Sequence, residues 1–326
     1  MATPSIIDQG QALLVAGQAD AAVRLMMTAA ARGERDALYQ LALWRVYGQP
    51  LPRDFAMARE LFGRAGAAGH KAGALTHAVF VAIGAGAPPD WTAAMAILDA
   101  ASKNDSAARR QRELLSAMKL TTDGAPVVVP PVETLSTSPR VGVVRGLFTP
   151  DECAHVATLS APLLTPSVVV DPRTHRQVPH PIRTSDGTVL GPIQQDLVIE
   201  ALNRRIAAVS GTRVEQGEPL AVLRYAPGQQ YRLHHDCLPG EPNQRVMTVI
   251  VYLNDGYDGG GTEFPAIGRT VQGRTGDAVV FANTLLDGTV DQSSQHAGRA
   301  VTRGQKWICT RWIRARDFDP WGMRPA

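Results

Sequence analysis

Two adjacent histidines and an aspartate lie in the stretch "YRLHHDCL", residues 231–238. Imidazole and carboxylate groups are common ligands of divalent transition metals. The surrounding residues predict a β-strand, and residues i and i+2 of a strand face the same side. His234 and Asp236 are therefore the natural pair of ligands, whereas His235 is expected to face the wall or the solvent. A His-x-Asp pair is frequent by chance, and by itself it would favour a structural histidine.

A third candidate ligand, His296, lies about sixty residues further on, in "QSSQHAGRAV", on another predicted strand that follows a turn. Two histidines and one carboxylate form the facial triad of non-haem Fe(II) oxygenases, which leaves three coordination positions open. The same donors also suit other divalent ions, so the triad alone does not identify iron.

A lysine that lies near the third candidate ligand in the sequence narrows the kinds of metal site that this triad could form. Most of the 33 basic residues are arginines, yet Lys306 follows His296 by ten residues on the next predicted strand. Its ammonium group could bind an anionic co-substrate whose other end chelates the metal. Tyr225 and Thr262, the latter in the "GGGTEFP" turn, could donate hydrogen bonds to the same carboxylates. The alternatives are a solvated lysine, a packed tyrosine and a threonine that caps a turn.

Other polar and aromatic residues invite plainer interpretations. Arg183 either lines a substrate channel or forms a local salt bridge, and the second is the simpler expectation. His175 and His180 lie in the polar stretch "DPRTHRQVPHP" and are interpreted as loop residues, with a mobile lid as the functional alternative. Trp307 and Trp312 are expected in the core.

The elements that position these residues begin near residue 141. A strand is predicted in "VGVVRGLF", and a helix follows with Thr149 as N-cap and Pro150 at its first position. A second amphipathic helix is predicted in "IQQDLVIEALNRRIAAVS". After Thr212 the chain changes to short apolar runs separated by turns such as "APGQ" and "GRTGD". Many short strands at this spacing predict a β-sandwich or barrel.

Residues 1–118 have a different period. They are rich in alanine, and "ALWRVYGQPLPRDFAMARELFGRAGAAG" from Ala42 aligns without a gap on "AVFVAIGAGAPPDWTAAMAILDAASKND" from Ala78, a shift of 36 residues. An earlier copy is visible in "AAVRLMMTAAARG", although its first helix lacks a clear match. Such repeats predict stacked helical hairpins; a plain bundle with chance similarity is the alternative. Residues 119–140 contain four prolines and are predicted to form a linker or an extended arm.

The composition sets limits on location and partners. Hydrophobic residues make up 44% and charged residues 19%, which is typical of a globular protein. The net charge is +3 and there is no basic tract, so no nucleic acid is expected as a partner. Three widely spaced cysteines favour a reducing compartment. Neither a signal peptide nor a membrane span is visible, so a cytoplasmic location without membrane contact is expected.

Four stretches carry a family resemblance: "LRYAPGQQYRLHHD", "YLNDGYDGGGTEFP", "GDAVVFAN" and "HAGRAVTRGQKWICTRWIR". Together with "RTSDG" they resemble the prolyl 4-hydroxylase-like branch of the 2-oxoglutarate- and Fe(II)-dependent dioxygenases. The resemblance implies that His234, Asp236 and His296 hold Fe(II). It also implies that Lys306 pairs with the distal carboxylate of 2-oxoglutarate, assisted by Tyr225 and Thr262. O2 would be the co-substrate, with ascorbate as an optional accompanying reductant.

The predicted architecture is an α+β multidomain chain. Residues 1–118 resemble the Sel1-like branch of the tetratricopeptide repeats and would form an all-α helical-repeat solenoid. The Pro-rich linker 119–140 would lead to residues 141–326, where the dioxygenase resemblance implies a double-stranded β-helix, or jelly-roll, with flanking helices. Three functions are compatible with this architecture. They are hydroxylation of a prolyl or other residue of a protein recruited by the repeats, hydroxylation of a small molecule or free amino acid, and a non-catalytic protein-binding scaffold.

Overall fold

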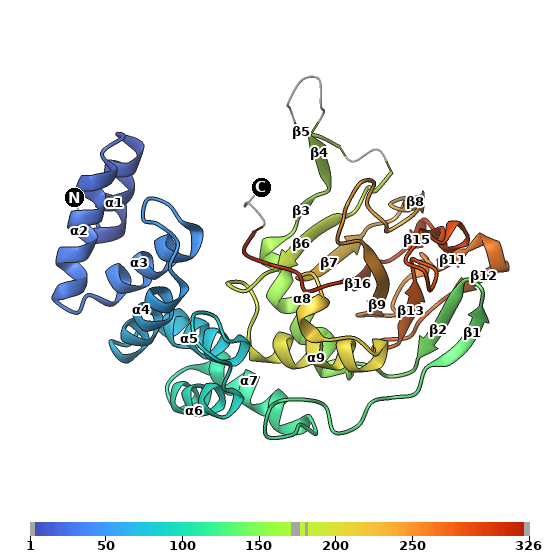
Figure 1. Cartoon of the computed structure of the whole chain (residues 1–326), viewed down its shortest axis with the longest axis horizontal. Helices are drawn as coiled ribbons and strands as arrows, with labels where there is room; N and C mark the ends of the chain where they lie inside the picture. Colours follow the sequence, from blue (N-terminus) through green and yellow to red (C-terminus); the bar gives the residue numbers. More distant parts are fainter. Residues whose placement is uncertain (1–3, 171–176, 180–181, 323–326) are drawn as a thin grey trace. The chain divides into compact units, whose positions relative to one another are not determined.

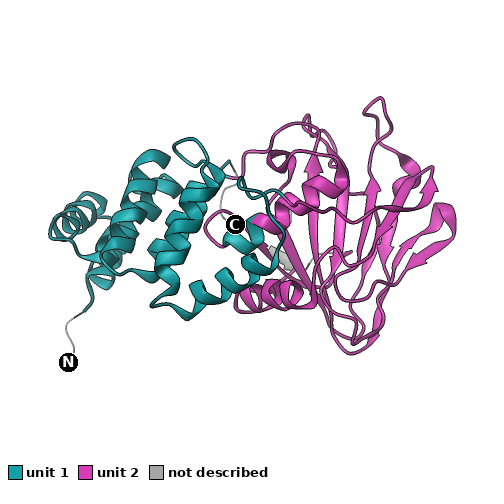
Figure 2. Cartoon of the chain, turned by 90° about the horizontal axis from the view of Figure 1, so that it is seen from below, with its two compact units in different colours: residues 1–125, 195–200, 321–326 teal, residues 126–194, 201–320 magenta. Residues whose placement is uncertain are grey.

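The computed structural model describes residues 4–170, 177–179 and 182–322. The chain divides into two compact units, coloured separately in Figure 2. The first unit comprises residues 1–125, 195–200 and 321–326, and the second comprises residues 126–194 and 201–320. His175 and His180, interpreted from the sequence as loop residues, lie outside the described residues.

The first unit is built from helices that contact one another in chain order (Figure 1). Their bounds are α1 (Ile6–Val15), α2 (Ala19–Ala31), α3 (Arg35–Tyr47), α4 (Phe55–Ala67), α5 (Lys71–Ile83), α6 (Trp91–Ser102) and α7 (Ser106–Ala117). The bounds of α2 recur in α4 after 36 residues, and those of α3 recur in α5. Helix α1 does not follow this register, which explains why its match in the sequence is poor.

The ends of the helices repeat with the same period. Asp54 and Asp90 are the N-caps of α4 and α6, and each side chain accepts a hydrogen bond from a backbone N–H in the first turn. Gly48 and Gly84 end α3 and α5 in the left-handed conformation, with φ of 75° and 76°. The 36-residue shift in the sequence is therefore a repeat of helix boundaries, and the predicted helical hairpins are confirmed.

Small residues let the hairpins approach closely. A Cβ atom at Gly66 in α4 would come within 2.9 Å of the Cα atom of Ala74 in α5. Ala58 and Ala94, which are 36 residues apart, are both fully buried. None of the helices within the described residues is both long and apolar enough to cross a lipid bilayer.

The second unit contains a large antiparallel sheet with the strand order β1-β2-β13-β9-β16-β7-β6-β3. Its strands are β1 (Glu133–Thr137), β2 (Arg140–Val144), β3 (Thr165–Pro166), β6 (Asp186–Leu190), β7 (Leu220–Tyr225), β9 (Arg245–Tyr252), β13 (Ala278–Ala282) and β16 (Lys306–Arg314).

A smaller antiparallel sheet has the order β12-β11-β14-β8. It consists of β8 (Tyr231–His234), β11 (Thr262–Phe264), β12 (Arg269–Val271) and β14 (His296–Gly298). Two further pairs are β4 (Val168–Val170) with β5 (Gln177–Pro179), and β10 (Asp258–Gly259) with β15 (Val301–Arg303). Short 3-10 helices occur at Ala161–Leu163, Val214–Gln216, Pro265–Ile267 and Gln292–Ser294.

The two sheets enclose a hydrophobic core, which includes Ile250 and Tyr252 of β9, Phe264 of β11, Phe281 of β13 and Ile308 of β16. Helices flank the large sheet: α8 (Pro150–Ser160) contacts β7, and α9 (Leu197–Ser210) contributes residues from Ala201 onward to this unit. Two sheets around one core with flanking helices confirm the predicted jelly-roll.

The stretch between the predicted domains is partly structured. Residues 133–137, within the predicted linker, form β1 at the edge of the large sheet. The sequence did not predict β3, β4, β5 or β6, because residues 165–190 contain prolines and polar side chains and lack a clear alternation.

Candidate metal and co-substrate site

Three side chains that are far apart in the sequence converge between the sheets. The candidate ligand atoms of His234, Asp236 and His296 all lie within 4.8 Å of one another. Sheet pairing produces this proximity, because His234 at the end of β8 lies opposite His296 at the start of β14. Asp236 follows β8 by two residues and still faces the same side. No other group of three acidic, histidine or cysteine side chains within the described residues has this spacing.

Both imidazoles are oriented by the backbone. Nδ1 of His234 lies 2.7 Å from the carbonyl oxygen of Arg232, and Nδ1 of His296 lies 3.2 Å from that of Ser294. A proton on each Nδ1 makes these contacts hydrogen bonds and leaves Nε2 as the free electron-pair donor. Each Nε2 is 3.6 Å from an oxygen of Asp236. The two rings therefore present their donor atoms to the same point.

Ring packing restrains the histidines further. Tyr231 stacks on His234 with ring centroids 3.5 Å apart, and Phe281 meets His296 edge to face at 4.5 Å. Burial lowers the pKa of His296 to about 4, although the Asp236 carboxylate acts in the opposite direction. The ring is therefore neutral at physiological pH, as a metal ligand must be.

The Asp236 carboxylate is buried and held from one side. Thr248 of β9 donates a hydrogen bond of 2.6 Å to its Oδ2, and the Thr248 hydroxyl accepts one of 2.9 Å from the amide of Asn283. Burial alone raises the pKa of Asp236, but His296, His234 and the Thr248 hydroxyl outweigh it, so the pKa lies below its usual range. The group is an anion at neutral pH.

Lys306, the first residue of β16, is the cation of this site. Its side chain is buried, and its Nζ donates a hydrogen bond of 2.6 Å to the carbonyl oxygen of Gly260. Nζ also lies 5.4 Å from the ring centroid of Tyr225 and 5.6 Å from that of Tyr252. Burial lowers its pKa to about 7. Among the described residues no acid pairs with it, so the site has a positive charge that an anionic ligand would balance.

The two predicted assisting residues lie beside this lysine. Tyr225 of β7 is the cross-strand partner of Lys306, and Thr262 begins β11 and is 2% exposed. The hydroxyl of Tyr252 donates a hydrogen bond of 2.8 Å to the Thr262 hydroxyl. Tyr252 and Thr248 were not singled out in the sequence. The alternation along "VMTVIVYLND", which places both on one face of a strand, is the signal that could have found them.

The remaining predictions from the sequence have mixed outcomes. His235 does not line the pocket, and its ring nitrogens are buried without a hydrogen-bond partner in the described part of the chain. Trp312, predicted for the core, is half-buried and lines the pocket, because β16 places it on the same face as Lys306. Trp307 is also half-buried and lies under the guanidinium of Arg224. Arg183 lies over the ring of Tyr231 at 5.6 Å.

The pocket brings the site residues together with an apolar wall. Its lining includes the three candidate ligands, Lys306, Tyr225 and Thr262, with aliphatic and aromatic neighbours such as Ile250, Ile308 and Tyr231. A larger cavity of about 280 Å³ lies elsewhere in the same unit, with Arg140 as its one charged lining residue. The larger cavity therefore lacks acid, imidazole and lysine groups, and the smaller pocket is the one that holds all of the candidate site residues.

Comparison with known proteins places the chain in a family. Residues 220–314 match the 2OG-Fe(II) oxygenase superfamily. Prolyl 4-hydroxylase 1 of Arabidopsis thaliana is 37% identical over 201 residues, which cover 56% of this chain and 71% of that protein. The chain belongs to the prolyl 4-hydroxylase family of 2OG-Fe(II) oxygenases. It is thus a 2-oxoglutarate-dependent dioxygenase that uses Fe(II) and O2, as its sequence resemblance implied.

Another relative and two solved structures are also similar to parts of this chain. Probable prolyl 4-hydroxylase 10 of Arabidopsis thaliana is 36% identical over 211 residues, covering 57% of this chain and 73% of that protein. Among solved structures, a viral collagen prolyl hydroxylase from Paramecium Bursaria Chlorella virus-1 is similar, with a TM-score of 0.44 and 24% identity over 54% of this chain and 96% of that one. A Sel1 repeat protein from Oxalobacter formigenes is also similar, with a TM-score of 0.30 and 19% identity over 33% of this chain and 85% of that one.

Proposed function

We propose that His234, Asp236 and His296 bind the Fe(II) of this oxygenase, and that Lys306 binds the distal carboxylate of 2-oxoglutarate. The observation that carries the proposal is the pairing of one buried triad with one buried lysine in a single pocket. Two imidazoles and a carboxylate are the donors of non-haem Fe(II) oxygenases. The orientation of both Nε2 atoms and the ionised state of Asp236 suit these residues to the metal.

The lysine suits the co-substrate for a separate reason. A buried cation without an acidic partner is costly, and an anion in the pocket removes that cost. Tyr225 and Thr262 lie beside Lys306 and are proposed to donate hydrogen bonds to the same carboxylate. Tyr252 would orient the Thr262 hydroxyl through the hydrogen bond between the two side chains.

The protein residues have distinct tasks in the proposed reaction. Bound Fe(II) supplies the activation of O2 that couples decarboxylation of 2-oxoglutarate to hydroxylation of an unactivated C–H bond. The three protein ligands occupy part of the coordination sphere and leave positions for other groups. Lys306 fixes the far end of the oxoacid, and the apolar wall formed by Ile250 and Ile308 excludes water from the reacting groups.

Metal binding tests the ligand assignment directly. Mn(II), followed by electron paramagnetic resonance, should bind the wild-type protein and should bind the His234→Ala variant at least about 100-fold more weakly, since one of three protein ligands is lost. The neighbouring substitution His235→Ala is the matched control and should leave the affinity within a factor of two. Equal losses in both variants would contradict the assignment.

We further propose that the substrate is a prolyl residue in a protein or peptide, since the similar proteins from Arabidopsis thaliana are named prolyl 4-hydroxylases. Residues 1–118 are proposed as a repeat domain that offers a surface to a polypeptide, with 119–140 as the connection and 141–326 as the catalytic domain. Mass spectrometry of proline-containing peptides and of free proline after turnover tests this. Addition of one oxygen atom to a peptide supports the proposal, whereas oxygen added only to the free amino acid contradicts it.

A further inference from the structure

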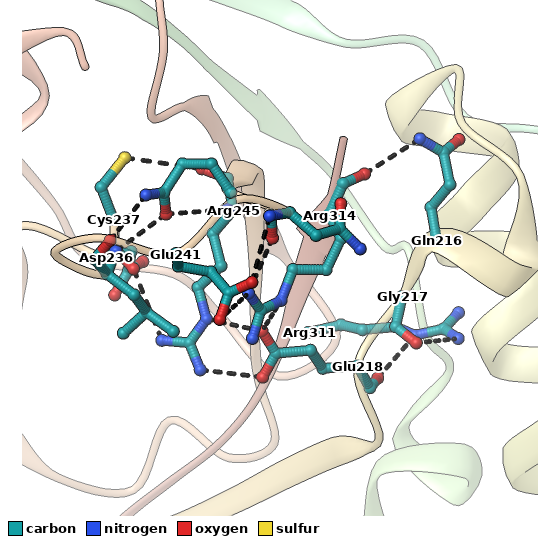
Figure 3. Close-up of polar contacts among 12 residues, drawn as sticks. Gln216, Gly217, Glu218, Asp236, Cys237, Glu241, Arg245, Arg311 and Arg314 are labelled. Carbon is teal, nitrogen blue, oxygen red and sulfur yellow. Dashed lines mark hydrogen bonds and ion pairs between the residues drawn. The ribbon is translucent and has the colours of Figure 1, made fainter. Parts of the chain in front are cut away.

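A buried carboxylate, Glu218, lies between two arginines beside the candidate metal site (Figure 3). It precedes β7, whereas Arg245 begins β9 and Arg314 ends β16. The side chains of Glu218 and Arg314 are each 8% exposed, and that of Arg245 is 16% exposed. Three distant segments thus contribute to one charged cluster in the interior of the second unit.

The pairing within the cluster is specific. Nε and Nη2 of Arg245 donate hydrogen bonds of 2.6 and 2.8 Å to the two oxygens of Glu218, a two-pronged arrangement that fixes the guanidinium plane. Nε of Arg314 lies 2.5 Å from the same carboxylate. The Arg245 guanidinium also lies over the ring of Trp312 at 4.1 Å. The orientation of Arg245 is therefore determined on two sides.

The third nitrogen of the Arg245 guanidinium, Nη1, contacts the backbone of the candidate ligand Asp236. This nitrogen donates a hydrogen bond of 3.4 Å to the backbone carbonyl oxygen of Asp236, which Figure 3 shows beside the cluster. One guanidinium thus connects the buried Glu218 carboxylate to the main chain of Asp236. Lysine at this position would have the charge but not the planar fork that spans both partners.

Asp236 needs such support because it lies outside the sheet. Strand β8 ends at His234, and residues 235–244 form turns and bends before β9 begins at Arg245. The far end of this segment is held by Arg314, whose Nη1 donates a hydrogen bond of 2.7 Å to the carbonyl oxygen of Asn243. Near Asp236 itself, Thr248 holds the carboxylate and Arg245 holds the backbone.

Stability alone does not explain a buried charged cluster. Replacing buried ion pairs by well-packed apolar residues is often neutral or stabilising, so such clusters are weak evidence for a stabilising role. Groups that orient metal ligands, in contrast, typically change metal affinity by about 10–100-fold when they are altered. The hydrogen bond from Arg245 to Asp236 has the location of such a group.

We propose that Arg245, held in place by Glu218, is a positioning residue that sets the direction of the Asp236 carboxylate toward the metal. Glu218 acts through Arg245 and does not touch the metal site. The inference rests on the proposed role of Asp236 as a metal ligand and deepens it, by assigning two residues that act on the metal site through Asp236 and are not proposed as ligands themselves.

Mn(II) affinity of the full-length protein tests the inference without any turnover. Arg245→Lys retains the positive charge opposite Glu218 but cannot contact both the Glu218 carboxylate and the Asp236 carbonyl oxygen. Glu218→Gln removes the negative charge that holds the Arg245 guanidinium in place. Both variants are expected to bind Mn(II) about 10–100-fold more weakly than the wild type. Glu241→Gln is the matched control, because Glu241 lies 3.7 Å from Arg314 in the same cluster but has no contact with the Asp236 carbonyl. Its affinity should stay within a factor of two.

Circular dichroism and thermal melting of each variant separate positioning from folding. Weaker Mn(II) binding by a variant that is folded at the temperature of the titration supports the inference. Folded Arg245→Lys and Glu218→Gln proteins with wild-type affinity would overturn it, and so would loss of folding in both, since the cluster would then serve the stability of the whole unit. The His234→Ala protein distinguishes a failure of the metal-site assignment from a failure of the positioning role. If it binds Mn(II) like the wild type, the metal site itself is wrong; if it does not, only the positioning role is at issue.

Discussion

At the scale of single residues, Lys306 makes the clearest prediction. Its ammonium group is buried and, within the described residues, has no acidic partner. Lys306→Met removes the charge and keeps most of the side-chain volume. We expect 2-oxoglutarate affinity, measured by calorimetry with Mn(II) present, to fall by at least about 100-fold, as expected for loss of a buried charged partner.

The same variant should not be destabilised in the absence of 2-oxoglutarate, since an unpaired buried charge is removed. Its melting temperature should equal or exceed that of the wild type. A strongly lowered melting temperature together with unchanged 2-oxoglutarate affinity would show that Lys306 serves the fold and not the ligand.

The lowered pKa of Lys306 also predicts a pH dependence. Burial places this pKa at about 7 without ligand, and a bound carboxylate raises it. Below pH 7 the lysine is already charged and the affinity for 2-oxoglutarate should be constant. Above pH 7 binding must take up a proton, so the affinity should fall by about tenfold per pH unit until the pKa of the complex is reached.

Lys306→Arg is the control for this pH profile, because arginine stays charged throughout the range. Isothermal titration calorimetry in buffers of different ionisation heat would measure affinity and proton uptake together. A range from about pH 6 to about pH 9 covers both sides of the lysine pKa of about 7. A profile of the wild type that is as flat as that of the arginine variant would contradict the assignment.

Thr248 gives a third test at this scale. Thr248→Val keeps the shape but removes the donor to Asp236 and leaves the Asn283 amide without its acceptor. We expect metal affinity to fall by about 10-fold or more and unfolding free energy to fall by about 1–3 kcal/mol. Thr248→Ser retains the hydroxyl and should restore most of the metal affinity. Equal affinities for the valine and serine variants would exclude a role for this hydrogen bond.

At the scale of elements, strand alternation explains how the site is assembled. Lys306, Ile308, Thr310 and Trp312 are successive residues on one face of β16, and all four line the pocket. Leu223 and Tyr225 do the same from β7. A single face of each strand therefore supplies pocket residues, and the opposite face is free to pack against helices such as α8, as the burial of Cys309 shows.

The repeat helices give a prediction of their own. Asp90 caps α6 by accepting a hydrogen bond of 2.8 Å from the backbone N–H of Ala93. Asp90→Ala should lower the unfolding free energy by about 0.5–2 kcal/mol, whereas Asp90→Asn should retain most of the stability because asparagine caps equally well. Chemical denaturation measures both. An alanine variant as stable as the wild type would mean that the cap does not contribute.

The local patterns of the sequence were sufficient for some elements and not for others. The 36-residue shift was sufficient to predict stacked helical hairpins, because residues such as Gly48 and Asp54, which lie at the ends of α3 and α4, recur with the same period. Most strands from β7 to β16 could also be recognised from apolar runs and turns, but β10 lies in a glycine-rich stretch that predicts a turn. Strands β3 and β6 could not, since two to five residues of mixed polarity form a strand only through pairing with a neighbour.

The same distinction applies to the candidate site. His234, Asp236, His296 and Lys306 were found from residue type, spacing and family resemblance, and the fold brings them into one pocket. The contacts of Thr248 and Arg245 with Asp236 depend on where β9 lies beside the segment that follows β8. Glu218 meets Arg245 only because distant segments converge, and no local pattern encodes that contact.

At the scale of the whole molecule, a helical-repeat unit and an oxygenase unit share one chain. Repeats of this kind commonly bind polypeptides, which agrees with a protein substrate for a member of the prolyl 4-hydroxylase family. The catalytic claim, however, depends on the second unit alone. The chemistry can therefore be tested on the full chain without first identifying a partner of the repeats.

The most direct measurement is succinate formation by the full-length protein with Fe(II), ascorbate, 2-oxoglutarate and a panel of proline-containing peptides. The account predicts turnover by the wild type and by His235→Ala, and none by His234→Ala. It also predicts that at least one peptide raises the rate above that with 2-oxoglutarate alone. Turnover by His234→Ala at the wild-type rate, or a wild-type protein that forms no succinate under any of these conditions, would contradict the assignment of this pocket as the site of 2-oxoglutarate oxidation.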